Sequence, residues 1–191
     1  MSKRECFGKY VNSSSVCYSC EDEAGCIQKT VGVKAIGRVS KDDNYLDTAL
    51  TISKRSSCIK RRYGCVIVKN DEIVSTGYNG SARGEVNCSD VGECPRLNEP
   101  SNSGDYSNCP AVHAEQNAML SASRKDMIGS TMYLAGDERR WSNINQSFFS
   151  WNEIKKPEPC PICLRLIKNS GIERVVTRKG IIWERDNPYL I

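Results

Sequence analysis

Two periodicities of apolar residues divide the chain into predicted helices and strands. A first helix is expected to begin at Asp42 or Asp43, with the aspartate as its N-cap, and to end near residues 56–58. Its apolar positions recur at helical spacing and are Tyr45, Leu46, Ala49, Leu50 and Ile52. The run 63–68 predicts a buried strand, and residues 73–78 predict its hairpin partner across a turn.

The later periodic segments alternate between helix and strand. Residue propensities predict a second helix from His113 to Arg124. A third helix is expected over residues 160–169, with Gly171 as its C-terminal stop. The remaining apolar runs predict strands at 131–134, 173–177 and 181–184. The order α-β-β-α-β-α-β-β predicts the α/β class, with helices packed on a mixed sheet.

Two long segments lack such a pattern. Residues 79–110 are polar and punctuated by glycine and proline, and a loop of this length is unusual in a compact domain unless it is functional or clamped. Three cysteines within it, Cys88, Cys94 and Cys109, are candidates for the clamp. Residues 136–158 are also polar, yet they carry Trp141 and Trp151, two of the three tryptophans.

Composition and charge narrow the class of protein. Of the 191 residues, 26% are charged and 39% are hydrophobic, which is typical of a soluble globular domain. The net charge of +4 permits an anionic ligand such as a nucleotide, but it is not that of a tail that coats nucleic acid. We find no signal-peptide pattern and no apolar run of membrane-spanning length. A cytoplasmic protein with no membrane partner is therefore expected.

Eleven cysteines are many for a chain without a secretory segment, and they favour metal binding over disulfides. One group lies within residues 1–30 and comprises Cys6, Cys17, Cys20 and Cys26. That stretch cannot build a core unaided, so it predicts a small module holding zinc or an iron–sulfur cluster. A disordered tail with incidental cysteines is the alternative. A second group could hold a structural metal and comprises Cys58, Cys88, Cys94 and Cys109. Cys65, inside a predicted strand, is expected to be a small buried hydrophobe.

The strongest chemical signal joins two short motifs. His113-Ala-Glu115 contains the only histidine of the chain, and Pro159-Cys160-Pro-Ile-Cys163 follows it. One nitrogen and two thiolates supply three zinc ligands and leave a fourth position for water, as in catalytic zinc sites. The H-x-E…P-C-x-x-C pattern is typical of zinc-dependent nucleobase deaminases. The alternative is a structural zinc site closed by a further cysteine such as Cys109.

The ligand set also assigns a role to Glu115. Two thiolates cancel the charge of zinc, so bound water is less acidic than in a three-histidine site, and a base must help to form hydroxide. Glu115, two residues from His113, is placed to take that proton and to protonate the departing amine.

Over residues 40–180 the chain resembles the deoxycytidylate deaminase family, which belongs to the cytidine deaminase superfamily. The resemblance is carried by His113-Ala-Glu115-Gln-Asn-Ala, by Pro159-Cys160-x-x-Cys163, by Thr76-Gly-Tyr-Asn79-Gly80 and by Ile167-x-Asn169-x-Gly171-Ile-x-Arg174-Val-Val. It implies a three-layer α/β/α sandwich with a five-stranded mixed sheet, a zinc-dependent deaminase domain over residues 31–191, and conversion of dCMP to dUMP and ammonia.

The resemblance also implies further sites. Zinc would be bound by His113, Cys160 and Cys163, and Asn79 would contact the sugar hydroxyl. Ala114 is taken as another substrate contact. Family members often form homo-oligomers, commonly hexamers. Several are regulated by deoxynucleoside triphosphates that bind near the Gly-Tyr-Asn-Gly loop. Some carry a second zinc ion with a structural role.

Two departures from the family pattern leave substrate and regulation open. About 20 extra residues precede Pro-Cys-x-x-Cys, and the module at 1–30 is not part of the family core. Arg83 and Arg124 are candidates for a substrate phosphate contact, because bidentate arginine recognition suits phosphate. Open alternatives are dCTP as substrate, a base in nucleic acid (adenosine in transfer RNA or cytosine in single-stranded DNA), and a non-catalytic zinc-stabilised binding module.

Overall fold

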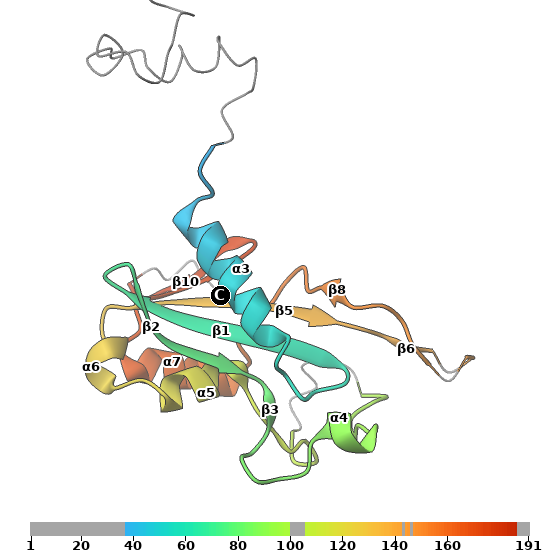
Figure 1. Cartoon of the computed structure of the whole chain (residues 1–191). Coiled ribbons are helices and arrows are strands. Elements are labelled where there is room, and N and C mark those ends of the chain that lie inside the picture. The colour runs from blue at the N-terminus through green and yellow to red at the C-terminus, as the bar shows by residue number, and fades with distance from the viewer. Residues whose placement is uncertain (1–36, 100–105, 143, 146, 187–191) are drawn as a thin grey trace, which may run out of the picture. The chain divides into compact units, whose positions relative to one another are not determined.

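The structure, a computed structural model, describes residues 37–99, 106–142, 144–145 and 147–186 (Figure 1). The chain divides into two units, Met1–Val39 and Ser40–Ile191, and the helices and strands described below belong to the second. The metal-binding module expected at residues 1–30, with its four cysteines, lies outside the described residues. In the described part of the chain, no helix is long and apolar enough to cross a membrane.

A mixed sheet forms the centre of the larger unit. Its strands lie in the order β10 (Gly180–Glu184), β9 (Arg174–Thr177), β5 (Thr131–Glu138), β1 (Arg61–Lys69) and β2 (Glu72–Tyr78). The short strand β8 (Asn152–Glu153) pairs with the end of β5 as a sixth member. Only β5 and β9 run parallel; the other described pairs of this sheet are antiparallel. The predicted mixed sheet with five main strands is confirmed.

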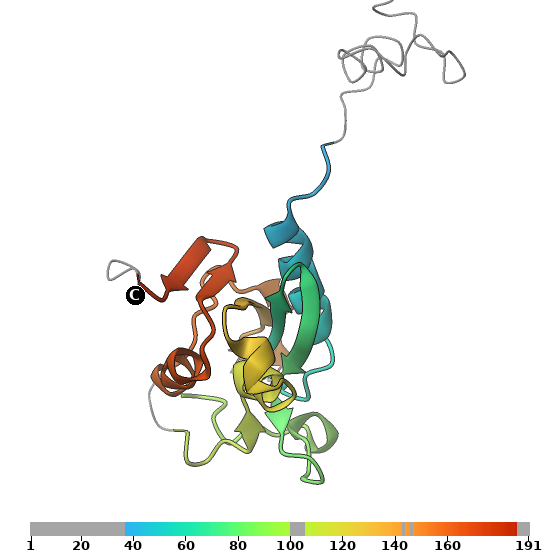
Figure 2. The ribbon, with the colours of Figure 1, turned by 90° about the vertical axis from the view of Figure 1, so that its left-hand side faces the viewer.

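Helices cover both faces of this sheet (Figure 2). Helix α3 (Lys41–Ser53) packs on one face, while α5 (Ala114–Leu120) and α7 (Pro161–Ser170) pack on the other. Alternation along β1 divides its side chains between the two cores, because successive strand residues point to opposite faces. Val66 joins the α3 core, and Cys65, fully buried as expected, joins the α5–α7 core. The predicted three-layer α/β/α sandwich is thereby confirmed.

A glycine sets the distance between α5 and the sheet. A Cβ added to Gly77 of β2 would lie 2.3 Å from both the Ala114 carbonyl oxygen and the Ala118 amide nitrogen. Backbone atoms of α5 therefore rest directly on β2 at this point. Since α5 carries Glu115 in its first turn, Gly77 helps to fix the height of that carboxylate above the sheet.

The predicted helix boundaries need two corrections. Helix α3 is capped by Ser40, whose Oγ accepts a hydrogen bond from the Asp43 amide at 3.1 Å, and not by an aspartate. The helix expected from His113 to Arg124 is broken: α5 ends at Leu120, and Ser123 caps a separate short helix, α6 (Arg124–Met127). Serine competes for backbone hydrogen bonds and favours caps over helix interiors, which explains the break.

The two segments without periodicity contain short elements. Within residues 79–112, β3 (Gly80–Ser81) pairs with β4 (Ala111–Val112), and α4 (Cys88–Val91) is a single helical turn. In the later segment β6 (Trp141–Ser142) pairs with β7 (Ser147–Phe148). The guanidinium of Arg62 stacks over Trp151 at 3.6 Å, which fastens this segment to β1.

Candidate metal centre and nucleotide pocket

His113 lies where β4 ends and α5 begins. It is the N-cap of α5, and its backbone amide donates to the Gln116 side chain at 2.9 Å. This contact holds the residue in an extended conformation just outside the helix, as a capping residue requires. Glu115 follows within the first turn and is buried, with 5% of its surface exposed.

The two cysteine ligands are placed by the start of α7. Cys160 is the N-cap of this helix, and its sulfur accepts a hydrogen bond from the Cys163 amide at 3.4 Å. Pro161 in the first turn and Gly171 in the left-handed C-cap fix the two ends of the helix. Both ligand segments therefore sit at helix N-termini, as predicted, where backbone N–H groups favour thiolate over thiol.

The three donor atoms have the spacing of a tetrahedral metal site. His113 Nδ1 lies 3.5 Å from Cys160 Sγ and 3.4 Å from Cys163 Sγ. A tetrahedron with zinc–nitrogen and zinc–sulfur bonds of ordinary length has edges of about 3.5 Å. Among the described residues, this is the only group of three or more potential ligands whose donor atoms all lie within 4.8 Å. The donors and their spacing fit zinc.

The charges around these donors interact strongly. Hydrogen bonding to Cys163, and next to it the His113 side chain, lowers the pKa of Cys160 to about 4 against the effect of burial. The same hydrogen bond to Cys160 raises the pKa of the Cys163 thiol well above its ordinary value. Burial raises the pKa of Glu115, although its backbone hydrogen bond and the nearby His113 oppose the shift. A carboxylate with a raised pKa beside the metal ligands is suited to carry a proton.

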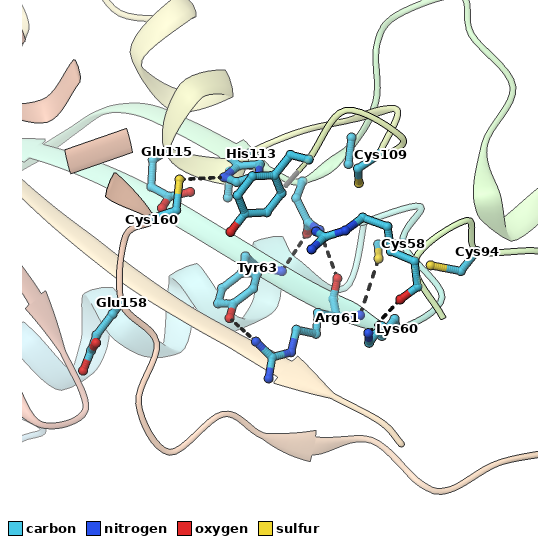
Figure 3. A pocket seen from close by; sticks show the side chains of 15 residues that line it. Cys58, Lys60, Arg61, Tyr63, Cys94, Cys109, His113, Glu115, Glu158 and Cys160 are labelled. Atoms are coloured by element: carbon cyan, nitrogen blue, oxygen red, sulfur yellow. Dashed lines mark hydrogen bonds between the residues drawn. The ribbon is translucent and has the colours of Figure 1, made fainter. Parts of the chain in front are cut away.

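These groups form one end of a cavity of about 120 Å³. Cys160 and Glu115 lie at that end, Tyr63 and Arg61 lie along the cavity, and Cys58 and Cys94 lie at the far end (Figure 3). Seven lining residues that the sequence analysis did not single out as site residues are Lys60, Arg61, Tyr63, Arg96, Tyr106, Ala111 and Glu158. For two of them the strand pattern holds a signal, because Arg61 and Tyr63 share the β1 face of Cys65, which packs beneath α5.

Asn79 lines the same cavity and is anchored by three hydrogen bonds. Its Oδ1 accepts from the Tyr63 amide at 2.7 Å and from Ser56 Oγ at 2.8 Å, while Nδ2 donates to the Arg61 carbonyl at 3.0 Å. An amide nitrogen has two hydrogens, so one donor of Asn79 remains for a ligand hydroxyl. Ala114 also lines the cavity.

The two arginines expected to contact phosphate lie elsewhere. Arg83 lines a separate polar hollow. Arg124 starts α6 and donates to the Asn169 carbonyl at 2.9 Å. The break between α5 and α6 removes the helical-face argument that placed Arg124 beside His113. Within the cavity, the cations are Lys60, Arg61 and Arg96.

The structure brings the second group of cysteines into one region. We call Cys58, Cys88, Cys94 and Cys109 the thiol cluster. Charge on the other three raises the pKa of Cys88, after the larger effect of burial. The Arg61 amide donates a hydrogen bond to Cys58 Sγ at 3.4 Å. No three of these described sulfurs lie within 4.8 Å of one another, so the cluster is wider than the His113 site.

Comparison with known proteins agrees with this geometry. The family described as "Cytidine and deoxycytidylate deaminase zinc-binding region" matches residues 39–179. A deoxycytidylate deaminase of Schizosaccharomyces pombe is 43% identical over 140 residues, covering 73% of this chain and 37% of the relative. A deoxycytidylate deaminase of Mycobacterium phage D29 is 37% identical over 150 residues, covering 75% of this chain and 98% of the relative.

Among solved structures, the dCMP deaminase of cyanophage S-TIM5 in apo form is similar, with a TM-score of 0.49 and 25% sequence identity. The match covers 74% of this chain and 85% of that chain. The chain spans little more than a third of the length of the Schizosaccharomyces pombe relative, but nearly all of the Mycobacterium phage D29 relative. The matched region includes both metal-ligand segments, and the chain belongs to the cytidine and deoxycytidylate deaminase family.

Proposed function

We propose that this chain catalyses the zinc-dependent hydrolytic deamination of dCMP to dUMP and ammonia. One observation carries the proposal: the buried Glu115 stands beside a His113–Cys160–Cys163 donor set that fits zinc, and Glu115, His113 and Cys160 line a cavity. A closed structural zinc site has no use for a buried carboxylate next to its ligands. The names of the two relatives above, both deoxycytidylate deaminases, support the choice of substrate.

In this mechanism, bound zinc supplies a Lewis acid that makes water a usable nucleophile near neutral pH. Glu115 takes the proton of the attacking water and passes it to the ring nitrogen of cytosine. The same carboxylate then takes the remaining proton from the hydroxyl group added to the ring carbon and delivers it to the exocyclic amine, so that the carbonyl forms as ammonia leaves. Asn79 holds the sugar hydroxyl through its remaining N–H, and Ala114 bounds the base beside His113.

We further propose that the phosphate of dCMP binds Arg61. This residue lies two positions from Tyr63 on the same strand face, so it is about 7 Å further along β1. Glu138 pairs with Arg61 at 2.5 Å, and Tyr63 Oη lies 3.4 Å from its guanidinium. Lys60 is less suited, because its Nζ already donates to the carbonyls of Arg96 and Glu99. A phosphate at Arg61 competes with Glu138 for the guanidinium, and a triphosphate would need partners beyond it.

The thiol cluster is proposed to bind a second zinc ion with a structural role. Its members come from the connection between α3 and β1, from α4 and from the long loop, so a shared metal would join three segments. Burial raises the pKa of Cys94, and a backbone hydrogen bond from Arg96 opposes that shift. Four thiolates closing a tetrahedral site are typical of structural zinc.

Regulation and assembly are proposed from the resemblance and from two surfaces. The polar hollow lined by Lys54, Arg55 and Arg83, beside Gly80, is the proposed site for a deoxynucleoside triphosphate effector. A groove with the exposed Leu120 and Leu166 is the proposed contact in a homo-oligomer, a hexamer by resemblance. We also propose a cytoplasmic location, and a metal-binding module at residues 1–30 joined to the deaminase domain at 31–191.

A substrate panel tests the activity. Purified protein with a measured zinc content is incubated separately with dCMP, dCTP, cytidine and a single-stranded oligonucleotide, and ammonia release is recorded. Turnover of dCMP well above the others is expected. Turnover only of dCTP or of the oligonucleotide would retain the chemistry and reject the substrate. No release from any of them, with zinc bound, would favour a binding module.

A further inference from the structure

Tyr106 and Arg96 form an aromatic wall beside the metal ligands. The ring centroid of Tyr106 lies 5.2 Å from that of His113, with the rings at 77°. The Arg96 guanidinium lies over the Tyr106 ring at 4.5 Å. Both residues line the cavity that holds Glu115. A base that lies beside His113 and Glu115 in this cavity is therefore next to a wall that includes the Tyr106 ring.

The Arg96 side chain and the backbone around it are held in place by an ion pair and by hydrogen bonds. Arg96 is largely buried and binds Glu99 at 2.9 Å through Nε. Lys60 donates to the carbonyl oxygens of Arg96 and Glu99 at 2.8 and 2.6 Å, which ties this part of the loop to the start of β1. A cation over one face of the ring, itself fixed by an ion pair, keeps the aromatic side chain from rotating away.

Both wall residues also adjoin the thiol cluster in sequence and by hydrogen bonds. The Cys109 amide donates to the Tyr106 carbonyl at 3.0 Å, and the backbone of Arg96 hydrogen-bonds the Cys94 sulfur. Whatever fixes Cys94 and Cys109 thus also fixes the backbone that presents the wall. Three members of the cluster line the same cavity as Tyr106.

We propose that Tyr106, backed by Arg96, stacks on the pyrimidine ring of the substrate, and that the thiol cluster positions this wall. The inference rests on the proposed deamination of dCMP and adds a substrate-contacting residue that neither motif contains. Every base can stack on an aromatic ring, so the wall contributes affinity and does not select the base. Discrimination between phosphorylated and free nucleosides is instead assigned to Arg61.

Steady-state kinetics on the zinc-loaded protein test the stacking. Tyr106→Ala is expected to raise the KM for dCMP about tenfold to a hundredfold with kcat changed less than about threefold, because uniform binding is lost. Tyr106→Phe keeps the ring and should keep the KM. Phe149→Ala, which removes an exposed aromatic side chain outside the cavity, serves as the control.

A double-mutant cycle tests the positioning. If Cys109→Ser acts through the wall, its effect on KM should be smaller in the Tyr106→Ala background than in the wild type. An unchanged KM in Tyr106→Ala, a Tyr106→Phe variant as impaired as Tyr106→Ala, loss of catalytic zinc from Tyr106→Ala, or additive effects in the cycle would each overturn the inference. If wild-type protein fails to turn over dCMP, the proposed function fails instead, and dUMP affinity measured by calorimetry in the same variants still tests the wall.

Discussion

Asn79 bridges β1 to the residues that follow α3: its side-chain oxygen accepts hydrogen bonds from the Tyr63 amide at 2.7 Å and from Ser56 Oγ at 2.8 Å. With 8% of its surface exposed, the side chain is both a structural link and a wall of the cavity. One substitution should therefore affect two separate measurements.

Asn79→Ala is expected to lower the free energy of unfolding by about 1–3 kcal/mol, because it leaves part-buried backbone groups of Tyr63 and Arg61 without their side-chain partner. The KM for dCMP should rise in the same variant. Urea denaturation and initial-rate kinetics give the two values. Asn152→Ala, at an exposed position, is the control and should change stability by less than about 0.5 kcal/mol. Unchanged stability in Asn79→Ala would contradict the structural link.

Gly77→Ala is expected to destabilise the chain by about 1–3 kcal/mol or more, because the added methyl would collide with the backbone of α5. Gly37→Ala is the matched control, since a Cβ at that position has no neighbour within 4 Å. Thermal or chemical denaturation compares the two. Equal stabilities would show that α5 can lift off β2 at little cost.

Arg61→Ala should reduce the preference for dCMP over cytidine. A charge-assisted phosphate contact contributes about 1.5–3 kcal/mol, so the ratio of the two kcat/KM values should fall by one to two orders of magnitude. The matched controls are Arg83→Ala and Arg124→Ala, which remove cations outside the cavity and should leave the ratio as it is. The phosphate assignment is wrong if a control lowers the ratio and Arg61→Ala does not.

Cys94→Ser and Cys109→Ser should each release a metal equivalent distinct from the one at His113, with a lower melting temperature. Removal of one thiolate from a four-thiolate site weakens it strongly, and the loop then loses its clamp. Metal content per chain is measured by mass spectrometry, with Cys65→Ala as a buried cysteine outside the cluster. Identical metal content in all of these proteins would reduce the thiol cluster to ordinary packing.

The sequence predicted the part of the site that depends on local spacing. His113, Glu115, Cys160 and Cys163 lie at two helix starts, and each start can be recognised from a few neighbouring residues. Arg96 and Tyr106 gave no such signal, because a long loop brings them to the cavity from distant positions. For Arg61 the alternation along β1 gives the strand face but not the cavity that this face lines. Arg124 was misplaced, since helix propensity did not outweigh the break at Ser121 to Ser123.

The same distinction holds for the fold. Periodicity sufficed for the main strands and for the helices that cover them, since apolar patterning sets which face is buried. It could not predict that β8 adds to the end of β5, or that Arg62 stacks on Trp151, because both are contacts between segments far apart in the chain.

Glu115→Gln tests the central claim most directly. The variant keeps the shape of the side chain but cannot carry the proton, so kcat for dCMP should fall by about a thousandfold or more. Bound zinc and the melting temperature should match the wild type, because Glu115 is proposed as a proton carrier and not as a ligand. Glu173→Gln, at an exposed position, is the control and should retain full turnover. Near-normal turnover by Glu115→Gln, or loss of the zinc held by His113, Cys160 and Cys163, would contradict the account.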